Sequence, residues 1–138
     1  MASIIYNSAL DDAVKGNIDF DTDSFKIMLV TSSYTADKDA HTKRSDVTNE
    51  ATGTGYTSGG DATTVTVTKD TANDRIDIDF TDVSWTTATL TAAGAVIYKT
   101  TGTASTDNLV AYLDFAGNVT STNGTFTVDI TSPLRIQN

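Results

Sequence analysis

The acidic residues Asp19, Asp21 and Asp23 have the spacing that opens a calcium-binding loop. In an EF-hand, such carboxylates are followed by a glycine at the sixth position and a glutamate at the twelfth. Those positions hold Ser24 and Val30 here, and Val30 belongs to an apolar run. The sequence therefore does not predict an EF-hand. A looser calcium site and an acidic turn before the first strand both remain open.

A second pair of carboxylates, Asp77 and Asp79, lies in a segment with strand alternation. On a strand the two side chains would share one face about 6.6 Å apart, a separation near that of inverting glycosidases. Such a site also needs a cleft and a neighbour that raises one pKa, and the adjoining sequence indicates neither. We expect both aspartates to be solvated groups that keep the sheet soluble.

A serine nucleophile would need a base, and His41 is the only histidine. No G-x-S-x-G string occurs, and the nearest, GYTSG (55–59), has the wrong spacing. P-loop, zinc and dinucleotide motifs are also missing. We expect His41 to be a solvated loop residue, and the chain to be no enzyme and to need no cofactor or metal.

The polar segment 32–60 is a better candidate for function. A connection this long without regular structure is usually a functional arm or a linker. Tyrosine and arginine are enriched at binding hot spots, and the candidate partner-binding residues are Tyr34, Lys43, Arg44 and Tyr56. We expect an extended arm that a partner orders. The alternative is a loose loop with Tyr56 folded back on the domain.

Only residues 3–16 have a helical pattern. The residues on one face at helical spacing are Ile5, Ala9, Leu10, Ala13 and Val14. A helix this short is marginal alone, so the sequence predicts that its apolar stripe packs on something. An edge of the sheet core and another chain are both open as the surface it covers.

The rest of the chain has strand patterns. Apolar residues alternate with polar ones, or form dense runs, in 25–31, 65–67, 76–80, 83–85, 95–98, 109–115, 126–130 and 134–136. Turn signals separate them, the strongest being Asn123-Gly124, which favours a hairpin. The sequence thus predicts an all-β fold: an antiparallel β-sandwich, jelly-roll-like, with seven or eight strands. It would be a single domain, 1–138, with one short N-terminal helix and the long arm.

The composition argues against several functions. The 138 residues carry a net charge of −9, whereas nucleic acids and anionic membranes attract basic surfaces. There is no cysteine for disulfides or thiolate metal sites. No stretch approaches the roughly 20 apolar residues of a membrane helix, and the first residues do not form a secretory signal. We expect a soluble protein that binds neither nucleic acid nor membrane.

Several strings resemble a family of small virion proteins of tailed bacteriophages. They are SFKIMLVTSSYT (24–35), DV (46–47), GTGY (53–56), GG (59–60), DVSW (82–85), AVIY (95–98) and LDF (113–115), in this order. The resemblance spans most of the chain, with one departure, since Ala36 stands where a proline commonly follows Tyr34-Thr35. These motifs are structural, not catalytic.

The resemblance implies a capsid decoration, or cement, protein. Such β-sandwich proteins bind the outside of the head and brace neighbouring major capsid protein subunits. It further implies synthesis in the host cytoplasm, a place in the virion, and association with copies of itself as a dimer or trimer. The alternative is a receptor- or glycan-binding module of a head or tail fibre. That role would need an exposed aromatic platform, and we expect the single tryptophan, Trp85, to be buried.

Overall fold

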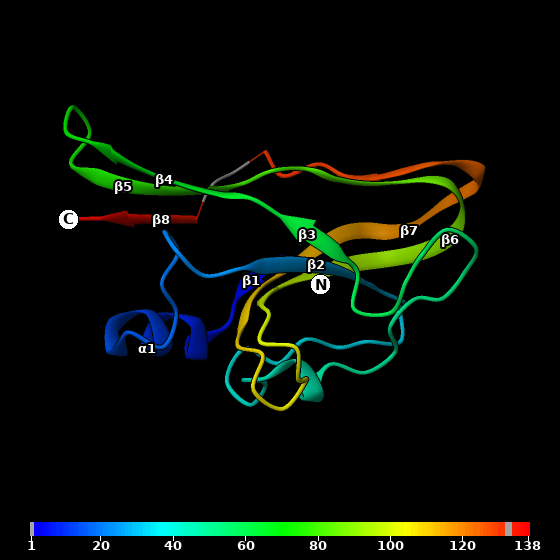
Figure 1. Ribbon diagram of the computed structural model, residues 1–138, viewed down its shortest axis with the longest axis horizontal. Coiled ribbons are helices and arrows are strands. Elements are labelled where there is room, and N and C mark those ends of the chain that lie inside the picture. Colours follow the sequence, from blue (N-terminus) through cyan, green and yellow to red (C-terminus); the bar gives the residue numbers. More distant parts are fainter. Residues whose placement is uncertain (1, 132–133) are drawn as a thin grey trace.

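Two antiparallel sheets and one short helix make up the fold (Figure 1). The computed structural model describes residues 2–131 and 134–138. The sheets have the strand orders β1-β7-β6-β2-β3 and β4-β5-β8. The elements are β1 (Ile4–Ile5), α1 (Asn7–Lys15), β2 (Phe25–Val30), the 3-10 turn η1 (Arg44–Asp46), β3 (Asp61–Thr63), β4 (Val65–Asp70), β5 (Arg75–Phe80), β6 (Val83–Lys99), β7 (Leu109–Val128) and β8 (Leu134–Gln137). The predicted antiparallel sandwich is confirmed, with its strands divided five and three.

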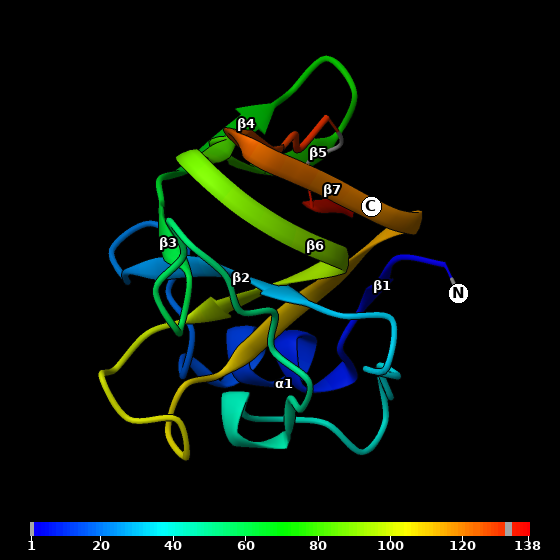
Figure 2. The same cartoon turned by 90° about the vertical axis from the view of Figure 1, so that its right-hand side faces the viewer.

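The longest elements, β6 and β7, are paired along their length and bend together from one layer into the other (Figures 1 and 2). Register shifts interrupt the pairing, and bulges of this kind bend and twist a ribbon. The predicted Asn-Gly hairpin turn is therefore wrong. Asn123 does have a positive φ of 46°, but within β7, where that strand carries an extra residue. The predicted strands 83–85 and 95–98 likewise belong to one strand.

Helix α1 is shorter than the predicted range 3–16. It begins after Tyr6, whose backbone is extended, and ends at Gly16, a left-handed C-cap with φ 78°. The two isoleucines before Tyr6 form β1 instead, because β-branched residues favour the strand that pairs with β7. The predicted apolar stripe is not buried as a whole. Leu10 is 51 % exposed and Val14 is 89 % exposed.

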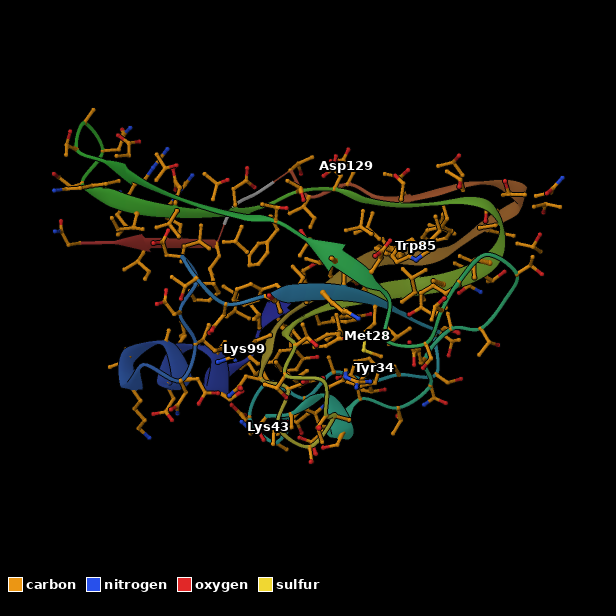
Figure 3. All side chains as sticks on the ribbon, viewed as in Figure 1. Met28, Tyr34, Lys43, Trp85, Lys99 and Asp129 are labelled. Atoms are coloured by element: carbon orange, nitrogen blue, oxygen red, sulfur yellow. The ribbon has the colours of Figure 1, made fainter. Side chains whose placement is uncertain are left out.

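Both faces of the five-stranded sheet are covered. The main core lies between the two sheets and includes Phe25, Ile27 and Trp85. A second cluster on the other face consists of Tyr6, Met28, Val30, Tyr34, Val96, Tyr98, Leu109 and Tyr112. Figure 3 shows Trp85 between the layers, and Met28 and Tyr34 on the other side of the five-stranded sheet. Because alternate side chains of β2 and β6 enter different clusters, these strands have continuous apolar runs.

The segment 32–60 is not an extended arm, because its first part is folded against this second face and its last part packs on the main core. It has little regular structure, yet its backbone is bonded to the sheet and to the loop before β7. The N–H of Ala51 donates to the carbonyl of Leu29 at 2.9 Å, and the N–H of Arg44 donates to that of Asp107 at 2.9 Å. The prediction of an extended arm is wrong because each of the few apolar side chains in the segment packs against the rest of the fold.

Residues 31–50, helix α1 and the loop 100–108 lie together on this side of the five-stranded sheet (Figures 1 and 2). We call them the covering layer. Hydrogen bonds join its parts to one another. Asn108 donates its side-chain amide to Asp12 Oδ2 of α1 at 2.7 Å, and the N–H of Asn7 donates to the carbonyl of Lys38 at 3.0 Å. The covering layer is thus a third layer of the sandwich.

Candidate partner-binding surface

Tyr34 is a buried anchor of the covering layer. Its side chain is 3 % exposed, and its hydroxyl lies 2.8 Å from the hydroxyl of Tyr6 and 3.0 Å from Nδ1 of His41. Its ring stacks on His41 and meets Tyr112 edge-on. Burial raises the pKa of Tyr34. The expectation of an exposed contact residue is corrected here, because a partner cannot reach this side chain in the folded layer.

His41, expected to be solvated, is half-buried against Tyr34. Its Nδ1 also accepts the backbone N–H of Asp37 at 3.3 Å. The single histidine therefore helps to hold residues 34–41 in a compact turn.

Tyr56 is half-buried and folds back on the main core, as in the alternative left open by the sequence. Its ring packs on Trp85 with centroids 5.5 Å apart. Its hydroxyl donates to Glu50 Oε1 at 2.7 Å and accepts the N–H of Leu29 at 3.0 Å. Burial raises the pKa of Tyr56, and the bond to Glu50 adds to this effect. Tyr56 thus fixes residues 51–60, the returning limb of the segment, to β2.

Within the covering layer, Arg44 joins residues 31–50 to the loop 100–108. Its Nε donates to Asp107 Oδ2 at 2.7 Å, where the carboxylate is 1 % exposed and the arginine side chain 23 %. The guanidinium also lies 5.2 Å from the ring centroid of Tyr98. Thr101 completes the site by donating its backbone N–H and its hydroxyl to Asp107 Oδ1. No local pattern in the sequence predicts Asp107, because its partner Arg44 is 63 positions away.

Lys43 is the predicted residue that offers a charge to the outside. Figure 3 shows it on the outer side of the covering layer. In the described part of the chain, neither its ammonium group nor that of Lys38 forms an ion pair. The exposed Leu10 and Val14 of α1 belong to the same layer. The sequence pattern missed these two as surface residues because it predicted a fully packed helix.

The acidic residues near Asp19 form a self-contained turn. Asp23 Oδ2 accepts the N–H of Asp19 at 2.8 Å and pairs with Lys99 Nζ at 2.9 Å. The N–H of Asp21 donates to Asp19 Oδ1 at 3.0 Å. Among residues 2–131 and 134–138, no group of three or more His, Asp or Glu side chains is arranged to hold a metal ion. This geometry favours the acidic turn over the calcium site.

Asp77 and Asp79 do not form an isolated carboxylate pair. Asp77 accepts from Arg75 at 3.1 Å and from Arg135 of β8 at 2.7 Å. Asp79 Oδ1 accepts the N–H of Phe80 at 3.0 Å. Asp77 therefore ties β8 to β5 by ion pairing.

A hollow of about 550 Å³ opens between the sheets beside β1 and β8. Most of its lining is apolar, and its ionisable side chains are Asp114, Asp129 and Tyr112.

No helix in the described residues is long and apolar enough to cross a bilayer. Comparison with known proteins gives no match: no family model, curated protein or solved structure is significantly similar to this chain.

Proposed function

We propose that this chain is a structural protein of a tailed-phage virion, which decorates the outer surface of the head and links neighbouring major capsid protein subunits. The observation that carries the proposal is that the strings resembling phage virion proteins contact one another. Tyr56 packs on Trp85, and the Tyr98 hydroxyl donates to the carbonyl of Gly59 at 2.5 Å. These resembling residues therefore belong to one structural unit, formed by β2, residues 53–60 and β6.

The covering layer supports this role because it combines a fixed backbone with groups for contact. Leu10 and Val14 offer apolar surface, while Lys38 and Lys43 offer positive charge that forms no ion pair within residues 2–131 and 134–138, in a chain of net charge −9. Burial of such apolar surface contributes free energy to an interface, and rim charges mainly set the association rate. We place the contact with the shell on this layer.

A role without catalysis agrees with the side chains described above, because the candidate acids and the histidine are engaged in structural hydrogen bonds and ion pairs. The fibre-module alternative has less support. Trp85 is 6 % exposed, and each aromatic ring in the described residues is buried or half-buried. An exposed stacking platform for a sugar is thus missing from this part of the chain.

Thermal release of the genome tests the proposal. A protein that binds only the assembled shell stabilises it by mass action. Heads stripped of this protein should release DNA at a lower temperature than decorated heads, and adding the purified protein should restore the difference. Equal release temperatures, with the protein located on tails, would contradict the cement role.

A further inference from the structure

The charged residues are unevenly distributed over the molecule. A fifth of the chain is charged, yet residues 51–60, 83–98 and 115–128 contain no Asp, Glu, Lys or Arg. These three stretches meet in space. Thr54 bridges to Thr89, and a Cβ on Gly53 would lie 2.2 Å from the Thr89 carbonyl. One end of the molecule, where β6 and β7 bend (Figures 1 and 2), is therefore uncharged.

The outer edge of β7 runs along this uncharged end. On one side β7 pairs with β6, with register shifts, but on the other it pairs only with β1, at Ala111 and Tyr112. In the described residues no strand pairs with this outer edge between 113 and 128. Any ten consecutive residues of this extended stretch span about 33 Å. Their side chains are largely exposed, including Val119 at 44 %.

The protection of this free edge is limited to the register shifts at residues 115–118 and 122–123 of β7. Natural proteins commonly place lysines or prolines on such an edge, since its unpaired backbone groups would otherwise join another strand. Edge strand β4 of the other sheet has Lys69 and Asp70, whereas β7 from 115 to 128 has neither charge nor proline. Several hydroxyls are already bonded across the ribbon, as in Thr91 with Thr120 at 3.0 Å, which lowers the cost of removing water from them.

The charge pattern favours a second copy of this chain as the partner. Two molecules of net charge −9 repel one another over most of their surfaces. The uncharged end is where two copies meet without placing like charges together. Two copies of one strand that pair antiparallel are related by a two-fold axis, so the same edge supplies both sides of the contact.

We propose that two copies of this chain associate through the outer edge of β7, residues 117–128, by antiparallel strand pairing. The contact lies away from the covering layer, so a dimer leaves both covering layers available. It does not depend on the capsid role, because it can be measured with the isolated protein.

Sedimentation equilibrium of the purified chain tests this contact. We expect a mass of twice 14.6 kDa at high concentration, and a dimer that tightens as salt rises from about 0.05 to 0.5 M, because salt screens the repulsion between the copies. Thr122→Lys should weaken the dimer at least about tenfold, since two-fold pairing brings the two new charges close. This lysine lowers the net negative charge, so a loss of association would report the edge and not the overall charge.

Thr66→Lys is the matched control, because Thr66 is also exposed on an edge strand, β4. It should leave the dimer intact, and circular dichroism should show both variants folded. A mass of 14.6 kDa at concentrations up to about 0.5 mM would overturn the proposal. An equal effect of the two lysines, or a dimer unaffected by Thr122→Lys, would overturn it as well.

Discussion

Among single residues of the covering layer, Asp107 is the buried charge on which most contacts converge. Its carboxylate pairs with Arg44 and accepts hydrogen bonds from the N–H and the hydroxyl of Thr101. A buried carboxylate is tolerated only when it is paired and hydrogen-bonded. Truncating Arg44 to alanine leaves this acceptor short of a partner, which costs about 1–3 kcal/mol of the free energy of unfolding.

The same site predicts a pH dependence. Burial alone would raise the pKa of Asp107, but the bonds from Thr101 and the ion pair with Arg44 outweigh it and hold the pKa below its usual value. A folded pKa below the unfolded value of about 3.9 gives stability that is complete above that pH. This stability is lost as the pH falls through the folded pKa.

Denaturant unfolding from about pH 6 to pH 2 checks this dependence. The wild-type free energy of unfolding should fall in the acid range, and Asp107→Asn should be less stable at pH 6 with a flatter curve. An Asp107→Asn curve parallel to that of the wild type would contradict the assignment. Asp46, whose pKa is also lowered by backbone bonds, keeps part of the slope in both proteins.

Alanine variants at Tyr34 and Lys43 distinguish a role in folding from a role in binding. Tyr34→Ala removes a ring that is 3 % exposed and should lower the free energy of unfolding by about 3–5 kcal/mol. Lys43→Ala removes an unpaired charge and should change it by less than about 0.5 kcal/mol. In head-binding assays Lys43→Ala should slow association and reduce its salt dependence. If Lys43→Ala destabilises the fold as much as Tyr34→Ala, the division of roles is wrong.

Among the elements, those with a regular apolar period are predictable from the sequence and those fixed by distant contacts are not. Strands β2 and β5 follow from their patterns of alternating or continuous apolar residues. The covering layer does not, because its order depends on Tyr34 meeting Tyr6 and Arg44 meeting Asp107, far apart in sequence. The sequence identifies the segment that contains the four candidate site residues, but it does not predict that Tyr34 is buried.

Two glycines test how closely the returning limb packs on β2. Gly60 has φ 74°, and a Cβ there would lie 1.8 Å from the carbonyl oxygen of Ile27. Gly16 has a similar φ of 78° with nothing within 4 Å of the added Cβ. Both alanine variants therefore carry the strain of positive φ, about 1–2 kcal/mol, and only Gly60→Ala carries the clash.

Thermal or denaturant unfolding of the two variants compares these costs. We expect Gly60→Ala to be less stable than Gly16→Ala by about 1–3 kcal/mol or more. Equal stabilities would show that Gly60 does not lie against Ile27, and the packing of this part of the chain on β2 would be incorrect.

The whole molecule combines a sandwich, a covering layer that we assign to the shell, and an uncharged end that we assign to a second copy. These surfaces are separate in the fold (Figure 2). A cement protein needs this separation, because one contact must hold the shell while another links neighbours. Many copies on one shell let modest single-site affinities stabilise the particle together.

Density of an intact virion at side-chain resolution tests this account most directly. We expect the chain on the outside of the head, with α1 and residues 31–50 against two or more major capsid protein subunits. The contact should include Lys43 and the exposed Leu10 and Val14, with Tyr34 inside the fold. Density for the chain on a tail or fibre, or on the head with the covering layer facing solvent, would contradict it.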